Sequence, residues 1–315
     1  MTRTWIVIGT RGSALALAQA HWVRDRLRER HPELEVRLAL IKTKGDKIQD
    51  VPLAKVGGKG LFVKEIEDAL LDGRVDLAVH SLKDVPAELP AGLAIDCLPE
   101  REDFRDSLVT PLGLDLESLP AAARVGTSSL RRQAQILHSR PDLTVMTLRG
   151  NLDTRLKKLA AGGFEAVVVA EAGLKRMNFN QVARRPFEPE VLLPAVGQGA
   201  LGLETRRDDD WLGQKIAFLH HQPTAWCVSA ERAFLVRMQG GCQVPLAALG
   251  RILGRSLKLD GLVASPDGRR FYRASMEAPL EEAETLGQRL ADHLLDRGGR
   301  EILAEVYKNA SGQTD

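Results

Sequence analysis

The sequence predicts an α/β fold of three domains, in which two related α/β domains are joined by hinge crossovers and followed by a small α+β domain. Three observations support this prediction. Strand-like and helix-like segments alternate as far as about residue 193. Two strand-to-helix turns, Ile8–Ser13 and Val125–Ser129, resemble each other, because in both a β-type run ends at Gly-Thr and a serine stands where a helix begins. From Gly240 onward, strand-like segments follow one another directly and precede one amphipathic helix.

The first domain is expected to comprise residues 1–99 and 200–239. Its alternating pattern predicts a largely parallel sheet covered by helices. The strand candidates are Thr4–Ile8, Val36–Ile41 and Leu77–Val79, and the helix candidates are Ala14–Arg30, Leu61–Asp72 and Thr224–Arg237. The loop 42–60 is rich in Lys, Gly and Asp without a clear period, which is typical of a lid.

The second domain, residues 100–199, repeats the pattern of the first. Its strand candidates are Arg124–Val125, Leu143–Met146 and Ala166–Val169, and its helix candidates are Leu130–Ser139 and Leu152–Ala161. The segments Pro99–Asp103 and Pro194–Gly199 are expected to cross between the first two domains, which would allow a hinge motion.

The third domain, residues 240–315, has a different character. Three strand candidates, with a tight turn at Ser265–Gly268, precede an amphipathic helix that ends near Gly298-Gly299. The strands are Leu246–Ile252, Ser256–Ala264 and Arg270–Met276, and the helix is Leu280–Leu295.

The composition excludes several classes of protein. A net charge of +2 and an aromatic content of 4% argue against a nucleic-acid binder. The N-terminus has no apolar targeting segment, and no run approaches the ~18 apolar residues of a membrane span. The three cysteines, Cys97, Cys227 and Cys242, are widely spaced and show no metal-ligand pairing. We therefore expect a cytoplasmic protein without a metal site.

Six arginines stand at or just after predicted strand ends, where open α/β sheets bind their ligands. The planar guanidinium binds carboxylates through two hydrogen bonds and stays charged, so this pattern indicates a polyanionic ligand. The alternative for each arginine alone is a solvated surface position. The six residues are Arg11, Arg131, Arg132, Arg149, Arg155 and Arg176.

Two further residues are candidates for chemistry. Asp84 follows a predicted buried strand and lies beside Lys83, where an ionised carboxylate is able to stabilise a cation or move a proton. Cys242 stands in a glycine loop, where an accessible thiol is able to act as a nucleophile or attachment point. The alternatives are a turn aspartate that binds its own backbone and an inert thiol. His80 is expected to be structural.

Taken together, the motifs resemble the porphobilinogen deaminase family, whose members are also called hydroxymethylbilane synthases. Each motif alone is weak, but their order is specific and spans nearly the whole chain. The motifs are Gly9–Ser13, Val79–Pro86, Gly126–Gln133, Leu148–Asn151, Pro194–Gly199 and Gly241-Cys242.

The resemblance implies a transferase of tetrapyrrole biosynthesis. Four molecules of porphobilinogen, a pyrrole with an acetate and a propionate, lose ammonia and are joined head to tail into the linear tetrapyrrole hydroxymethylbilane. In this family the chain grows on a dipyrromethane cofactor held by a thioether, for which the matching position is Cys242. A monomer that passes its product to uroporphyrinogen-III synthase is implied as well.

The resemblance also implies the roles of individual residues. Asp84 matches the catalytic carboxylate, which holds pyrrole N–H groups and stabilises an azafulvene-like cation. The implied cofactor ligands are Lys83, Asp84, Ser129, Arg131 and Arg132. The implied substrate contacts are Arg11, Ser13, Lys59, Phe62, Thr127, Arg149, Arg155, Arg176 and Gln198, with Lys59 and Phe62 in or beside the lid.

Two other classes of protein have the hinged architecture predicted for this chain, in which two periplasmic-binding-protein-like α/β domains are joined by crossovers. A solute-binding protein would normally carry a secretion signal and would have no use for Gly241-Cys242. A regulatory ligand sensor would need a DNA-binding or effector segment, and the third domain shows no such pattern. The sequence therefore favours the transferase.

Overall fold

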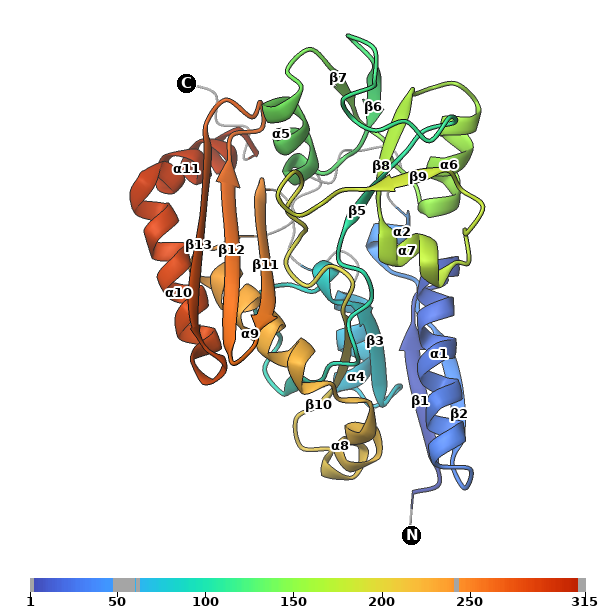
Figure 1. Ribbon diagram of the computed structural model, residues 1–315. Coiled ribbons are helices and arrows are strands. Elements are labelled where there is room, and N and C mark those ends of the chain that lie inside the picture. The colour runs from blue at the N-terminus through green and yellow to red at the C-terminus, as the bar shows by residue number, and fades with distance from the viewer. Residues whose placement is uncertain (1–2, 48–59, 61–62, 241–243, 311–315) are drawn as a thin grey trace. The chain divides into compact units, whose positions relative to one another are not determined.

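The structure, a computed structural model, describes residues 3–47, 60, 63–240 and 244–310 (Figure 1). These residues form two compact units. One contains the described residues up to 102 together with 199–225, and the other contains 103–198 and the described residues from 226 onward.

The first unit is built on a five-stranded sheet of order β2-β1-β3-β10-β4. Strands β1, β2 and β3 are parallel, whereas β10 pairs antiparallel with both β3 and β4. The strands are β1 (Trp5–Thr10), β2 (Glu35–Leu40), β3 (Leu77–Ser81), β4 (Leu93–Cys97) and β10 (Leu201–Arg206). The sheet is therefore mostly parallel, with one reversed strand that follows the crossover Pro194–Gly199.

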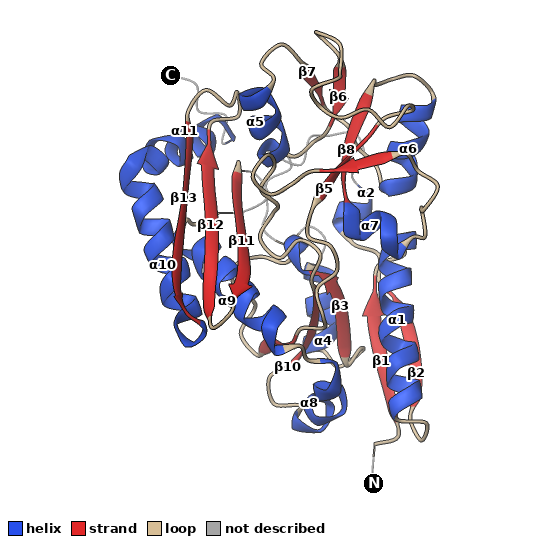
Figure 2. Cartoon of the chain, in the orientation of Figure 1, coloured by secondary structure: helices blue, strands red, loops and turns tan. Residues whose placement is uncertain are grey.

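Helices cover both faces of this sheet, as Figure 2 shows for α1 beside β1 and β2. On one face, α1 (Ala14–Arg30) and α8 (Asp210–Ile216) pack against the strands, and on the other face α4 (Lys64–Leu71) does so. Because both faces are buried, the strands are mostly apolar. A short helix, α2 (Lys44–Lys47), lies at the start of the predicted lid, and residues 48–59 are outside the described residues.

The second unit contains a sheet of order β7-β6-β8-β5-β9, which repeats the arrangement of the first. Strands β6, β7 and β8 are parallel to one another, and β5 pairs antiparallel with both β8 and β9. The strands are β5 (Asp106–Val109), β6 (Arg124–Gly126), β7 (Thr144–Met146), β8 (Ala166–Ala170) and β9 (Arg184–Pro186), and the helices are α5 (Leu130–Ser139), α6 (Leu152–Ala160) and α7 (Glu171–Arg176). The predicted internal repeat is thus visible in the topology of both sheets.

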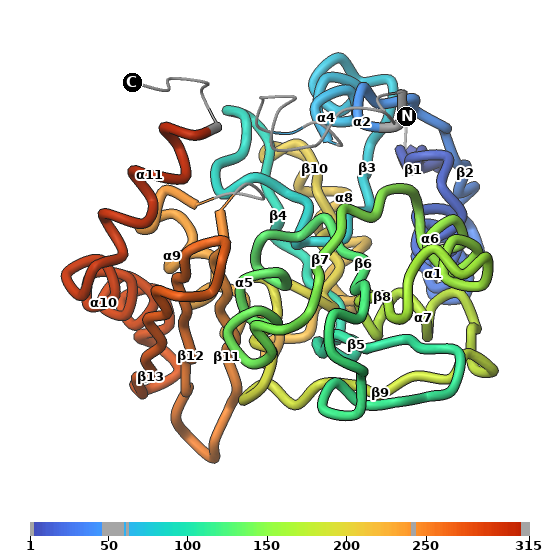
Figure 3. The backbone as a smooth tube through the Cα atoms, turned by 90° about the horizontal axis from the view of Figure 1, so that it is seen from above, coloured from blue at the N-terminus to red at the C-terminus, as the bar shows by residue number. Residues whose placement is uncertain are grey.

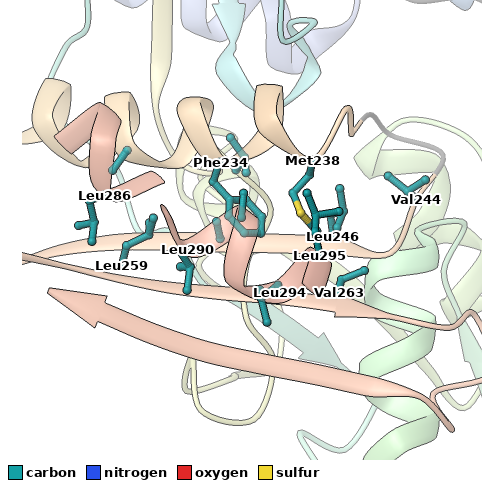
Figure 4. Close-up of a cluster of buried hydrophobic side chains, with 14 of the residues drawn as sticks. Phe234, Met238, Val244, Leu246, Leu259, Val263, Leu286, Leu290, Leu294 and Leu295 are labelled. Carbon is teal, nitrogen blue, oxygen red and sulfur yellow. The ribbon is translucent and has the colours of Figure 1, made fainter. Parts of the chain in front are cut away.

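The second unit also contains a three-stranded antiparallel sheet, β11-β12-β13, with α10 lying along β12 and β13 (Figure 3). Figure 4 shows its core, in which Phe234 of α9 lies near Leu290 of α10, and Met238 of α9 lies beside Leu246 and Leu295. The opposite face of the sheet packs on Ala134 of α5. The elements are α9 (Gln222–Arg237), β11 (Leu246–Leu253), β12 (Ser256–Ala264), β13 (Phe271–Pro279), α10 (Ala283–Leu294) and α11 (Arg300–Ala310).

The predicted fold class is confirmed, since two five-stranded α/β sheets and a small C-terminal α+β part are present. The helices Ala14–Arg30 and Leu130–Ser139 and the strand Ser256–Ala264 have the predicted bounds. The helix α9 lies before the predicted boundary at residue 240, yet its apolar side chains belong to the C-terminal core.

Several elements escaped the sequence prediction, and they are α2, β4, β5, β9, β10, α7, α8 and α11. Two of the missed strands carry buried acidic residues, Asp106 in β5 and Glu204 in β10. A carboxylate in a short run is typical of a loop unless a distant partner neutralises it, so the local pattern did not indicate these strands.

Candidate active site

A pocket of the first unit lies where β1 and β3 end at the carboxyl edge of the sheet. Ser13 caps α1 beside it, because its side chain accepts a hydrogen bond from the Ala16 N–H at 3.3 Å. A capped helix N-terminus directs its remaining N–H groups and positive dipole end toward an anion. The lining residues are Arg11, Ser13, Leu15, Ala16, Gln19, Val63, Ile66, Val79, His80, Ser81 and Asp84.

The chain places Asp84 in this pocket through a 3₁₀ turn, Leu82–Asp84, directly after β3. The turn is fixed because the Leu82 N–H donates to the Ala200 carbonyl at 3.0 Å and the Val85 N–H to the Leu82 carbonyl at 3.1 Å. Asp84 is half-buried, and no residue that the structure describes hydrogen-bonds or ion-pairs with its carboxylate. Lys83, in the same turn, is half-buried as well. The pocket therefore presents a carboxylate that is able to bind a cation or an N–H donor.

Behind the pocket, three buried titratable residues meet from three elements. His80 of β3 donates through Nε2 to Glu204 Oε2 of β10 at 2.8 Å, and Glu67 lies on the facing helix α4. Burial, together with the nearby Glu204 carboxylate, raises the pKa of Glu67 to about 7, although His80 acts in the opposite direction. The expected structural role of His80 fits this buried pair.

Glu67→Gln is expected to change how stability depends on pH. A carboxyl whose pKa is higher in the folded state binds its proton more tightly there, so its stabilising contribution is present below about pH 4.5 and is lost as the pH rises through about 7. Glutamine does not titrate, so the stability of the unmodified chain relative to Glu67→Gln should fall across this interval. Urea unfolding of both proteins between pH 4.5 and 8 measures this difference.

The control for this experiment is Glu88→Gln, which changes an exposed carboxylate elsewhere in the first unit. Besides Glu204 and His80, the charged groups that influence Glu67 are Asp68 and Lys64. Parallel pH profiles for the unmodified chain and Glu67→Gln would show that Glu67 does not hold its proton.

The N-terminus of α5 in the second unit repeats the geometry of α1. Ser129 caps this helix by accepting from the Arg132 N–H at 3.4 Å, and Thr127 Oγ1 accepts from the Ser129 N–H at 3.1 Å. Ser128 Oγ donates to the Leu148 carbonyl at 2.7 Å, which ties this turn to the neighbouring loop. Thr127 itself is buried, and its hydroxyl stabilises the turn by accepting the hydrogen bond from the Ser129 N–H.

Arg131 and Arg132 of α5 converge on one carboxylate, that of Asp106. Arg131 Nη1 donates to Asp106 Oδ2 at 2.7 Å, and Arg132 Nη2 donates to Oδ1 at 2.6 Å. Gln198 Nε2 donates to the same Oδ1 at 2.9 Å and to the Phe104 carbonyl at 2.8 Å. Three predicted ligand residues, Arg131, Arg132 and Gln198, thus donate hydrogen bonds to the same carboxylate. The sequence did not indicate Asp106, which carries that carboxylate.

Arg149 and Arg155 flank a turn whose geometry depends on glycine. Gly150 has a φ of +112°, and a Cβ there would lie 2.6 Å from Thr154 Cγ2. Arg155 Nε donates to the Gly150 carbonyl at 2.9 Å, and Asn151 caps α6 by accepting from the Thr154 N–H at 3.1 Å. Arg176, the last residue of α7, is half-buried elsewhere in the same unit.

The cysteines differ in their surroundings. Cys97 is 2% exposed and its thiol donates to the Ile216 carbonyl at 3.3 Å, and burial raises its pKa to about 12. Cys227 is buried in α9. Cys242, Lys59 and Phe62 lie outside the described residues.

The predicted site residues therefore fall into two groups. Arg11, Ser13, Lys83 and Asp84 belong to the first unit, and the remaining described residues belong to the second. The sequence did not indicate a role for Asp106, because it follows the mostly charged segment Arg101–Arg105. One more carboxylate after such a segment does not stand out as a buried residue. No helix in the described part of the chain is long and apolar enough to cross a membrane.

Comparisons with known proteins decide the family. The family model described as "Porphobilinogen deaminase, dipyromethane cofactor binding domain" matches residues 6–214, and the one described as "Porphobilinogen deaminase, C-terminal domain" matches residues 225–296. The chain belongs to the porphobilinogen deaminase family. It is accordingly a transferase of tetrapyrrole biosynthesis with a dipyrromethane cofactor, which favours this class over a solute-binding protein or a ligand sensor.

Curated members of the porphobilinogen deaminase family align along nearly their whole length. The porphobilinogen deaminase of Pelobacter propionicus is 55% identical over 301 residues, covering 96% of this chain and 97% of the relative. Those of Geotalea uraniireducens and Syntrophotalea carbinolica are 54% and 55% identical, with coverage of 96% and 97% of this chain and 94% and 97% of the relatives.

Similar solved structures include two sulfonate-binding proteins. The alkanesulfonate-binding protein SsuA from Xanthomonas axonopodis pv. citri has 15% identity and a TM-score of 0.37, with 75% of each chain covered. The periplasmic aliphatic sulphonate binding protein SsuA from Escherichia coli has 17% identity and a TM-score of 0.40, covering 76% of this chain and 71% of that one.

Proposed function

We propose that Asp84 and Cys242 carry the chemistry by which this chain joins four porphobilinogen molecules head to tail into hydroxymethylbilane. The observation that supports this most strongly is the pocket that combines Arg11, Ser13 and Asp84 at the carboxyl edge of one sheet. Arg11 and the capped N-terminus of α1 suit the carboxylates of the substrate, and the Asp84 carboxylate suits its pyrrole N–H.

Asp84 is assigned to the positive charge that develops when ammonia leaves the substrate. A half-buried carboxylate lowers the energy of a nearby pyrrole cation without having to reorganise, since the turn after β3 already holds it in place. The same carboxylate is able to accept the proton that the pyrrole releases when the new carbon–carbon bond has formed.

The charges of the second unit suit the dipyrromethane cofactor. Two buried guanidinium groups, those of Arg131 and Arg132, contact a single carboxylate, so one positive charge is left over for an anionic ligand. We assign Lys83, Asp84, Ser129, Arg131 and Arg132 to the cofactor. When bound, this group supplies the terminal pyrrole carbon to which the first substrate is added.

Cys242 is assigned as the attachment point by its sequence context and by contrast with the other thiols. A thioether forms from a thiolate, and the buried Cys97 with its raised pKa is a poor source of one. Cys227 is packed against the C-terminal sheet, where a Cβ at Gly250 would lie 2.9 Å from the Cys227 Cα. Cys242 remains as the thiol in a glycine loop.

The remaining predicted contact residues are assigned to the substrate and the growing chain. Every added ring brings two carboxylates, so a series of cationic and hydrogen-bonding groups is needed. The residues are Arg11, Ser13, Lys59, Phe62, Thr127, Arg149, Arg155, Arg176 and Gln198. We also propose a monomer in the cytoplasm with three domains, at residues 1–99 with 200–239, 100–199 and 240–315, that passes its product to uroporphyrinogen-III synthase.

The intact mass of the purified chain, with peptide mapping around Cys242, tests the proposed function. We expect a surplus equal to two linked porphobilinogen-derived units, located on Cys242. A chain that stays unmodified after incubation with porphobilinogen or hydroxymethylbilane would contradict the proposal.

A further inference from the structure

Asp106 is a buried carboxylate around which the polar interior of the second unit is organised. It is the first residue of β5 and has no exposed surface. Burial raises its pKa, but Arg131 and Arg132 outweigh this effect and hold the pKa of Asp106 well below its usual range. Asp106 is therefore ionised, and its charge is available to both arginines.

Each guanidinium is held by more than this ion pair. Arg131 Nη1 also donates to the Leu193 carbonyl at 2.7 Å, and Arg132 Nη1 donates to the Val168 carbonyl at 2.8 Å. Long side chains that are fixed in this way have already lost their rotamer freedom before a ligand arrives. The two arginines are thus preorganised by β5, β8 and the segment before the second crossover.

The bonds of the two arginines are distributed unequally. Arg132 uses Nε, Nη1 and Nη2 on Asp106 and Val168. Arg131 uses Nη1 alone among the contacts of the described residues, so its Nε and Nη2 are available to a further acceptor. Because two cations share one carboxylate, that acceptor is expected to be an anion.

We infer that Asp106 is a positioning residue for cofactor binding: it holds the guanidinium of Arg131 so that its Nε and Nη2 meet a carboxylate of the dipyrromethane cofactor. Asp106 itself does not contact the cofactor. Gln198 contributes by donating to Asp106 Oδ1, which fixes the orientation of that carboxylate. This inference rests on the proposed function, in which Arg131 and Arg132 bind the cofactor.

The test compares cofactor loading in two variants of Asp106. Asp106→Asn removes the charge, and Asp106→Glu keeps the charge but moves the carboxylate by one methylene group. Each cofactor-free protein is incubated with hydroxymethylbilane, and the adduct on Cys242 is followed by intact mass. Partners that orient ligand-holding side chains are worth about 10–100-fold in affinity at metal sites, and we expect loading to slow by a similar factor in both variants.

The matched control is Glu171→Gln. Glu171 is also buried in this unit, pairs with Arg184 at 2.9 Å and accepts from Ser107 Oγ, next to Asp106. This variant loses a buried carboxylate without touching α5. We expect it to lower the unfolding temperature and to load the cofactor at the rate of the unmodified chain.

A double-mutant cycle separates positioning from general destabilisation. If Asp106 acts through Arg131, the loading rate of Arg131→Gln should change little when Asp106→Glu is added. Independent effects would multiply, and that result would overturn the inference. Loading of Asp106→Glu at the rate of the unmodified chain would overturn it as well.

The unmodified chain distinguishes a failure of the proposed function from a failure of the role assigned to Asp106. If it fails to acquire the adduct on Cys242, the proposed function itself is contradicted. If it acquires the adduct and Asp106→Glu does so equally fast, only the role of Asp106 is wrong. Asp106→Glu keeps this test decisive even if Asp106→Asn does not fold, because it retains the charge that the arginines require.

Discussion

Asp84→Asn is expected to keep the cofactor on Cys242 while its turnover falls by about 10²–10³-fold, the usual effect of removing one preorganised electrostatic group. Asparagine has nearly the same shape as aspartate and retains one carbonyl oxygen for a pyrrole N–H. It lacks the negative charge that stabilises a cation and the basicity that accepts a proton. Because the structure gives Asp84 no ion-pair partner among the described residues, the fold should tolerate the change.

Single-turnover kinetics with the cofactor-loaded protein would measure this loss, and intact mass would confirm that the cofactor is present. Glu88→Gln is the matched control, since Glu88 is an exposed carboxylate shortly after the same turn and does not line the pocket. We expect Glu88→Gln to retain normal rates. Near-normal rates in Asp84→Asn would remove Asp84 from the mechanism.

Cys242→Ser is expected to give a folded protein without a covalent pyrrole and without turnover. A serine hydroxyl ionises far less readily than a thiol, so it does not replace the thiolate in forming the bond to the cofactor. The noncovalent site that we assign to Arg131 and Arg132 is unchanged in this variant. Hydroxymethylbilane should therefore still raise its unfolding temperature, although no mass is added.

Cys227→Ser provides the comparison, because it makes the same chemical change at a buried position. It should purify with the adduct intact. Peptide mapping distinguishes the outcomes, and an adduct found on Cys97 or Cys227 in the Cys242→Ser protein would overturn the assignment of the attachment point.

Local patterns in the sequence were sufficient to predict much of the fold. The helix α1 begins after Ser13 and α5 after Ser129, because each serine side chain satisfies an N–H of the first turn. Strand β12 has the predicted bounds because its residues alternate between two buried faces of the C-terminal sheet. These features depend on neighbours within a few residues, so they are readable from the chain alone.

The sequence motifs supplied the predicted ligand residues, but they did not indicate the buried residues that contact them. Arg131, Arg132 and Asp84 belong to motifs whose order identifies the family. Asp106 and Glu204 gave no signal, since a carboxylate in a charged or short segment normally faces solvent. Their burial depends on partners that folding brings to them from elsewhere in the chain.

The sequence by itself determined most of the helices, the serine caps of α1 and α5, most of the strands, and the ordered set of motifs that marks this family. Only the tertiary structure decided the pairing of reversed strands and the identity of the buried polar partners. Gln198 lies 92 residues from Asp106 and His80 lies 124 residues from Glu204 along the chain. Hydrogen bonds over such separations form only when the sheets assemble, because burial then removes the water that these charged groups would otherwise bind.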